Sequence, residues 1–132
     1  MIQILKTANY SASLDRIEDY WYACQFPLGN DRLLDELADT VIAHLQNHPR
    51  LGRNFLQRQT QSIGTQARLD KLKALLATLG TDTEQAEIRE YVMTDYLLLY
   101  ALVGDVIYLL AIKHHKQRTF ALDDAASKTL QK

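Results

Sequence analysis

The sequence predicts an α+β protein in which a helical hairpin packs on one face of an antiparallel sheet. Two observations carry this prediction. Apolar residues recur at helical spacing in the first two thirds of the chain, and the densest β-forming runs are grouped behind them. The length of 132 residues, with 47% hydrophobic and 23% charged residues, is typical of one folded domain. We therefore expect a single domain over residues 1–132.

The N-terminal segment predicts a strand and then a first helix. Ile2 and Ile4 lie on either side of Gln3, with the two-residue spacing of a strand. An apolar stripe at helical spacing follows, formed by Leu14, Ile17, Trp21 and Cys24. We expect Ser11 or Ser13 to cap this helix, because their hydroxyl groups accept hydrogen bonds from free backbone N–H groups. Cys24, at the end of the stripe, is expected to be a buried thiol.

A second helix follows a break at residues 27–30 and completes the hairpin. Its apolar positions repeat with the clearest periodicity in the chain: Leu33, Leu34, Leu37, Ala38, Val41, Ile42 and Leu45. Asn30 or Asp31 is its expected N-cap, and His48 and Pro49 are expected to stop it. The short break predicts that the two helices pack as an antiparallel hairpin.

A third helix is predicted inside an insertion at about residues 54–86. Its stripe consists of Leu69, Leu72, Leu75, Leu76 and Leu79. Gly80 is the expected residue just beyond the helix end, where glycine tolerates a left-handed conformation. The polar stretch Arg53–Thr65 before this helix is interpreted as a loop.

The last part of the chain predicts a three-stranded antiparallel meander. Its strands are the runs Glu87–Met93, Tyr96–Val103 and Val106–Ile112. Gly104 and Asp105 separate the last two runs, which is a good hairpin signal. A short C-terminal tail is expected at residues 119–132.

Composition limits the possible functions. The net charge is −1, from 15 basic and 16 acidic residues, so any basic site must be local. One cysteine forms neither an internal disulfide nor a thiolate metal cluster, and we expect no metal or other cofactor. The N-terminus does not have the pattern of a signal peptide, and the longest apolar run is too short to span a bilayer. A cytoplasmic protein without membrane contact is expected.

Two segments carry a resemblance to a known family. The first is Ile88–Gln117, which contains a Tyr-flanked strand, a turn with Asp, a second strand and a basic end. The second is HPRLGR, at His48–Arg53, which follows the second helix. Together with the first strand and the hairpin, they resemble the RelE/ParE family of bacterial toxins, over most of the chain outside Asn54–Ala86.

The resemblance implies a type II toxin, as in plasmid stabilisation systems, that a cognate antitoxin wraps and inhibits. RelE-like members cleave messenger RNA on the ribosome, with basic and acid–base groups on the open face of the sheet and in the tail. ParE-like members share the fold, lack that catalytic set and poison DNA gyrase. This chain has Ala101 where an arginine often follows the strand tyrosine, and it has no tyrosine after Tyr108. The resemblance is therefore ParE-like more than RelE-like.

Two alternatives remain open at this point. One is a ribosome-dependent messenger-RNA endonuclease. The other is a non-toxic family member that serves as an interaction protein, with the leucine-striped insertion forming a homo-oligomer.

The segment Lys113–Arg118 is the densest concentration of groups suited to RNA cleavage, which needs proton transfer and positive charge. The catalytic candidates are Arg89, Lys113, His114, His115 and Lys116. On a strand, Lys113 and His114 face opposite sides, so only part of the set can share a site. Arg89 is expected on a neighbouring strand, facing the same surface. The alternative is a solvated basic strand end that keeps a sheet edge soluble.

Basic residues also suggest where a target or a nucleic acid binds. The candidates are Arg50, Arg53, Arg58, Arg89, Lys113, Lys116 and Arg118. His44 and His48 have the spacing of metal ligands on a helix, but without a third ligand they predict no metal site. The aromatic run at residues 20–22 is expected to pack in the core and the hairpin.

Overall fold

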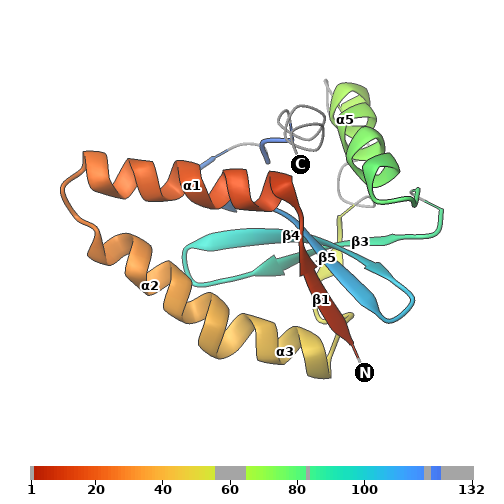
Figure 1. Ribbon diagram of the computed structural model, residues 1–132, viewed down its shortest axis with the longest axis horizontal. Coiled ribbons are helices and arrows are strands. Elements are labelled where there is room, and N and C mark those ends of the chain that lie inside the picture. Colours follow the sequence, from red (N-terminus) through yellow and green to blue (C-terminus); the bar gives the residue numbers. More distant parts are fainter. Residues whose placement is uncertain (1, 56–64, 83, 118–119, 123–132) are drawn as a thin grey trace.

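The computed structural model describes residues 2–55, 65–82, 84–117 and 120–122. It has the α+β architecture that the sequence predicts, with a strand, a helical hairpin, an inserted helix and a meander in that order (Figure 1). Its elements are β1 (Gln3–Lys6), α1 (Ala8–Ala23), α2 (Leu28–Glu36), a π-helical turn (Leu37–Val41), α3 (Ile42–Asn47), β2 (Arg53–Asn54), α5 (Thr65–Thr78), β3 (Glu87–Val92), β4 (Tyr96–Val103) and β5 (Val106–His114).

The sheet contains the predicted meander and one further strand at each edge. Its order is β1-β5-β4-β3-β2. β1 pairs with β5 in parallel, whereas the other neighbouring strands pair antiparallel, so the sheet is mixed. The helices between β1 and β2 carry the chain from one edge of the sheet to the other. At the other edge, Arg53 and Asn54 pair with β3, so the prediction that these two residues lie in a loop is wrong. Gly104 lies in the β4–β5 turn with φ +59°, as the hairpin signal predicts.

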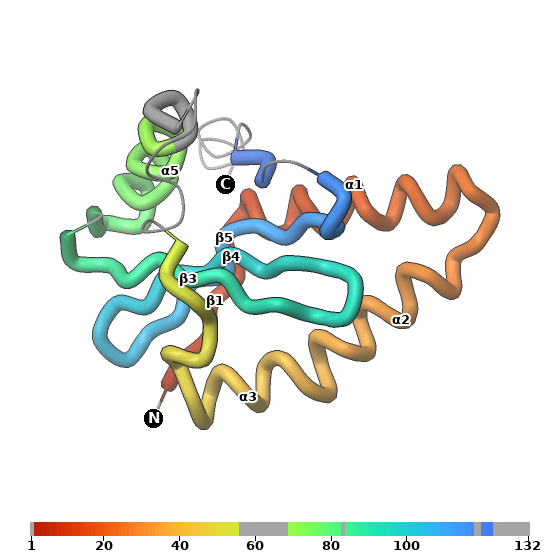
Figure 2. Tube along the Cα trace, turned by 180° about the vertical axis from the view of Figure 1, so that it is seen from behind, coloured from red at the N-terminus to blue at the C-terminus, as the bar shows by residue number. Residues whose placement is uncertain are grey.

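Both faces of the sheet are covered. Leu98, Tyr100 and Leu102 of β4 belong to the core under the hairpin helices α1 to α3. The alternating residues Leu97, Leu99 and Ala101 belong to a second core under α5. Figure 2 shows α5 and α3 on opposite sides of the strands. We call these the hairpin face and the α5 face. The predicted hairpin layer is confirmed, and the structure adds α5 as a second layer.

The N-terminus of α1 is set by Thr7, so the prediction of Ser11 or Ser13 as its cap is wrong. The Thr7 hydroxyl accepts a hydrogen bond from the Tyr10 backbone N–H (3.1 Å) and donates one to the Leu109 carbonyl (2.8 Å). Thr7 therefore starts the helix one residue after β1 ends and also ties it to β5. The sequence pattern of a cap does not include this second, long-range contact.

The connection between α1 and α2 lies earlier in the chain than predicted, at residues 24–27 instead of 27–30. Gln25 adopts φ +59° beyond the end of α1, a conformation that usually belongs to glycine. Pro27 is the N-cap of α2, so the prediction of Asn30 or Asp31 as its cap is wrong. Cys24 is exposed, and the expectation of a buried thiol is wrong as well.

The ends of the other helices agree with their predicted signals. The helical segment that starts at Leu28 ends at Asn47, directly before His48 and Pro49. Beyond α5, Gly80 has φ +78°, and the Thr81 N–H donates to the Leu76 carbonyl (3.1 Å). None of the described helices is both long and apolar enough to cross a lipid bilayer.

Candidate functional site

Lys113 lies in the α5 face and is buried. The residue is only 6% exposed, and its Nζ donates a hydrogen bond to the Gln117 carbonyl (2.8 Å). The ammonium group lies 5.3 Å from the ring centre of Phe120, in the segment that closes this face. Burial lowers the pKa of Lys113, and the nearby Glu90 carboxylate opposes that effect. Lys113 is therefore enclosed by the protein rather than offered to a substrate.

His114 lies on the hairpin face, so it points away from Lys113, as strand alternation predicts. Its ring meets Tyr96 edge-on, with ring centres 5.3 Å apart. Its Nδ1 accepts a hydrogen bond from the Lys116 backbone N–H (3.1 Å). His115 instead donates from Nε2 to the Met93 carbonyl (3.3 Å). The two histidines therefore make contacts with different parts of the structure.

Arg89 does not join this cluster, and the prediction that it lies on a neighbouring strand is wrong. β4 separates β3 from β5 in the sheet. The Arg89 guanidinium donates to the Gly52 carbonyl (2.6 Å) and pairs with Glu87 (3.1 Å). It thus holds the turn after α3 against β3. The five catalytic candidates therefore do not form one cluster. They lie on both faces of the sheet, and those near β5 are separated from Arg89 on β3 by the width of β4.

The arginines after the hairpin are paired with acids of β3. Arg50 bonds Glu87 at 2.7 Å and Arg53 bonds Glu90 at 2.7 Å. The hydrogen bonds from Arg50 lower the pKa of Glu87, while burial opposes them. Arg58 and Arg118 lie outside the described residues. The predicted basic group is therefore largely neutralised where the structure describes it, and Lys116 is an exposed cation beyond it.

The HPRLGR segment is fixed to the centre of the sheet by one tyrosine. The Tyr100 hydroxyl accepts from the Gly52 N–H (2.9 Å) and donates to the Pro49 carbonyl (2.8 Å). A Cβ at Gly52 would lie 2.8 Å from the Tyr100 ring, so this position needs glycine. The two segments that carry the family resemblance thus form one structural unit.

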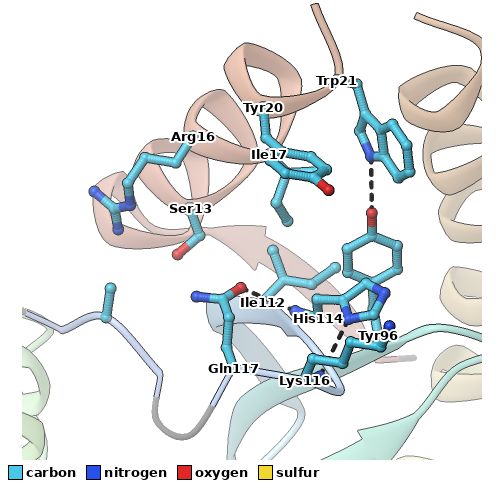
Figure 3. Close-up of a pocket in the computed structure, with 11 residues that line it drawn as sticks. Ser13, Arg16, Ile17, Tyr20, Trp21, Tyr96, Ile112, His114, Lys116 and Gln117 are labelled. Carbon is cyan, nitrogen blue, oxygen red and sulfur yellow. Dashed lines mark hydrogen bonds between the residues drawn. The ribbon is translucent and has the colours of Figure 1, made fainter. Parts of the chain in front are cut away.

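A pocket of about 560 Å³ opens between α1 and the end of β5. Figure 3 shows residues from α1, from Tyr96 and from the turn after β5 around it. The lining residues are Ser13, Arg16, Ile17, Tyr20, Trp21, Tyr96, Ile112, His114, Lys116, Gln117 and Ala121. Of the predicted site residues, this pocket brings together His114 and Lys116.

Several residues that line the pocket were not among the predicted site residues. Ser13, Arg16, Ile17 and Tyr20 recur at i, i+3, i+4 and i+7, the spacing of one helix face. That signal is readable in the sequence. The spacing predicts that these residues share one face of α1, but it does not predict that this face lies beside the end of β5.

Exposed apolar side chains gather on the hairpin. Eight large hydrophobic residues are exposed within the described part of the chain, and five of them lie in α1, α2 and their connection: Tyr20, Tyr22, Phe26, Leu28 and Leu34. We call these five the hairpin patch. The connection lies at one end of the molecule (Figure 1). Because Tyr20 and Tyr22 are each 60% exposed, the prediction that the whole aromatic run packs inward is wrong for these two.

The third residue of that run, Trp21, does pack inward. Its indole N–H donates to the Tyr96 hydroxyl (3.0 Å), and its ring lies against Gly29.

His44 Nδ1 shares a hydrogen bond with the Tyr91 hydroxyl (2.9 Å). Among the residues that the structure describes, no group of three or more side chains has the geometry to hold a metal ion.

Comparison with known proteins agrees with this architecture. A search of curated proteins finds no match to the chain. A family model described as the ParE toxin of the type II toxin-antitoxin system, parDE, matches residues 4–119. That range runs from β1 through β5 and includes α5. The chain belongs to the ParE toxin family of type II toxin–antitoxin systems.

Proposed function

We propose that this toxin acts by binding a cellular target such as DNA gyrase, and that a cognate antitoxin neutralises it. In this proposal the protein works in the cytoplasm, where gyrase and its DNA are found. Toxicity comes from occupying a target rather than from a bond that the toxin itself cleaves.

The observation that carries this proposal is the covered α5 face. The family resemblance assigns RNA cleavage to the face of the sheet opposite the hairpin. Here Leu72, Leu75 and Leu76 of α5 are buried on that face, and Lys113 lies beneath Phe120. A ribonuclease needs a cation and a proton-transfer group that reach the scissile phosphate. The enclosed Lys113 and the distant Arg89 favour a binding toxin.

We assign macromolecular contacts to the hairpin patch, which spans more than one face of the hairpin because Tyr20 and Tyr22 are two positions apart on α1. Its five side chains are aromatic or leucine, the types that dominate the centres of protein interfaces. An antitoxin segment that folds on the toxin would bury this patch. The apolar side chains would then be covered while the toxin is held in the inactive complex. A small open reading frame beside the toxin gene is the expected source of that segment.

Controlled expression in bacteria tests the proposal. We expect the chain alone to arrest growth and co-expression of the neighbouring reading frame to restore it. The double variant Tyr22→Ser/Leu28→Ser should lose toxicity while remaining folded. Leu51→Ser is a matched control, because the exposed fraction of Leu51 lies between those of Leu28 and Tyr22 but the residue lies outside the hairpin.

Primer extension on cellular transcripts separates the two mechanisms. New transcript ends at fixed codon positions after induction would establish the endonuclease alternative and refute the binding mechanism. Normal growth with abundant folded protein would instead identify a non-toxic interaction protein.

A further inference from the structure

We propose that the antitoxin segment that covers the hairpin is basic, with lysine or arginine side chains beside its apolar contacts. This inference rests on the proposed function, in which an antitoxin buries the hairpin patch, and it adds the chemistry of that partner. The reason is the exposed surface of α1 and α2, where apolar side chains lie at the connection and acidic side chains lie along both helices.

The apolar contact lies at the connection between the two helices. Tyr22, Phe26 and Leu28 are 60%, 42% and 46% exposed, and we call these three residues the hairpin tip. Trp21 lies behind the tip: its ring centre is 5.8 Å from that of Phe26, and its indole N–H is held by the Tyr96 hydroxyl. The connection lies at one end of the molecule (Figure 1). The tip is therefore a preformed apolar part of the hairpin patch.

The exposed surface along the two helices is acidic. Between Ala8 and Asn47 the chain has seven acidic residues and two arginines. One of the acidic side chains, Glu36, accepts a hydrogen bond from the Thr94 N–H (3.0 Å). The other six are exposed: Asp15, Glu18, Asp19, Asp31, Asp35 and Asp39. Within the described part of the chain, none of these six carboxylates takes part in a hydrogen bond or an ion pair. They are therefore available to an approaching cation.

On α1, two of these carboxylates share a face with the tip. Asp15 and Glu18 precede Tyr22 by seven and four positions, which is the spacing of one helix face. Ile17 lies on another face of the same helix and is buried in the core under the hairpin. A partner that packs on Tyr22 therefore also meets negative charge along α1.

The second helix, α2, repeats this arrangement. Asp31 and Asp35 follow Leu28 by three and seven positions, again on one face. Arg32 is the one basic residue of α2, and its guanidinium lies over the Phe26 ring, 5.8 Å from the ring centre. Arg32 therefore packs on the tip instead of pairing with either carboxylate. On both helices the apolar residue lies near the connection, and the carboxylates lie farther from it.

This division of the surface defines the partner. A purely apolar segment would cover the tip and leave the carboxylates without partners at the edge of the contact, and an acidic segment would meet like charge. A segment with apolar side chains at the tip and lysine or arginine along the helices is complementary to both parts. Opposite charges at the edge of an interface mainly speed association and select the correct partner. Each exposed ion pair contributes a factor of about 1.5 to 5 in affinity.

Surface plasmon resonance measures this contribution. The purified full-length toxin is titrated onto the immobilised product of the open reading frame beside the toxin gene, at low and at high salt concentration. We expect Asp31→Asn/Asp35→Asn to bind about fivefold more weakly than the wild type in about 50 mM NaCl, through slower association. The difference should shrink to less than about twofold in about 500 mM NaCl, because salt screens exposed charges. Asp15→Asn/Glu18→Gln tests α1 in the same way.

Two further variants serve as comparisons. Glu84→Gln/Asp105→Asn removes the same charge from exposed positions outside the hairpin, so it should bind as the wild type does at both salt concentrations. Tyr22→Ser/Leu28→Ser removes apolar contacts of the tip, so it should dissociate faster at both concentrations. Circular dichroism of each variant establishes that it is folded before its binding is measured.

The results separate this inference from the proposed function. Suppose that Tyr22→Ser/Leu28→Ser weakens binding, but that both carboxylate pairs can be neutralised without loss of affinity at low salt. The segment is then not basic and this inference is overturned, while the hairpin remains the antitoxin contact. Tighter binding after neutralisation would overturn it as well, and would identify an acidic segment. If the product of the reading frame does not bind the wild-type toxin, or binds it independently of the hairpin patch, the proposed function fails and this inference fails with it.

Discussion

Replacing Leu76 with alanine tests whether α5 is part of the core or an appendage of the toxin. Leu76 is 0% exposed and packs in the cluster that joins α5 to the α5 face of the sheet. Truncating a buried leucine removes its transfer free energy and leaves a cavity, at a cost of about 2–5 kcal/mol. Because α5 has one layer of protein beneath it and solvent above, partial collapse is possible, and we expect about 3 kcal/mol.

The assay is thermal denaturation followed by far-ultraviolet circular dichroism. A loss of about 3 kcal/mol in the free energy of unfolding corresponds to a midpoint temperature lower by roughly 10 °C for a domain of this size. Leu34→Ala is the matched control, since Leu34 is 43% exposed on α2 and should cost less than about 1 kcal/mol. Equal stability of the two variants would refute the placement of α5 on the sheet. It would also remove the main argument against a nuclease face.

Three further predictions concern the framework around the site. Tyr100→Phe leaves the Gly52 N–H without its partner and should cost about 1–3 kcal/mol in chemical denaturation, whereas an unchanged midpoint would mean that the hydrogen bond is not formed. Gln25→Gly relieves a left-handed residue and should raise stability by about 1 kcal/mol, while the same change at Gln46, inside α3, should lower it by a similar amount; the same sign at both positions would contradict the geometry. Burial raises the pKa of Tyr10 from 10.0 to about 12, so the unfolded chain loses this proton first and stability falls as the pH rises from 10 to 12. Tyr10→Phe should remove about 2 kcal/mol of that fall at pH 12, and parallel alkaline profiles of the two proteins would exclude it.

The parts of the fold set by local patterns could be read from the sequence. The stop at His48 and Pro49, the left-handed Gly80 and the Gly104 turn all depend on the conformational limits of one or two residues. The meander and the helical stripes depend on periodicity. Each of these features was predicted in place.

The errors arose where a distant contact decides the outcome. Thr7 caps α1 because its hydroxyl also bonds the Leu109 carbonyl, more than a hundred residues away along the chain. Gly29, predicted in the break, lies inside α2, where its lack of a Cβ lets the helix pack against the Trp21 ring. Arg53 pairs with Glu90 as part of a short edge strand, although its neighbours in sequence are polar. Local preference does not contain these contacts.

The leucine stripe of the insertion shows the same limit. A stripe predicts that a helix buries one face, but it does not name the partner surface. Leu72 and Leu76 pack on the sheet of their own chain. Lysine at both positions should therefore destabilise the toxin itself, and a change in its oligomeric state would not isolate an interface.

The sequence identified residues with suitable side chains, but it did not predict which of them lie together in the fold. His114 and Lys116 share a pocket with α1, whereas Lys113 is enclosed on the other face and Arg89 braces the turn after α3. Strand alternation separates Lys113 from His114, and that much follows from sequence. The order of the strands, which puts β4 between β3 and β5, does not.

DNA supercoiling by purified gyrase tests the proposed mode of action most directly. The toxin, added to gyrase with relaxed plasmid and ATP, should inhibit supercoiling in proportion to its concentration. The folded Tyr22→Ser/Leu28→Ser variant should inhibit at least about tenfold less, because those side chains belong to the hairpin patch. Leu51→Ser should inhibit as the wild type does. Full gyrase activity at a molar excess of the folded, growth-arresting toxin would contradict gyrase as the target.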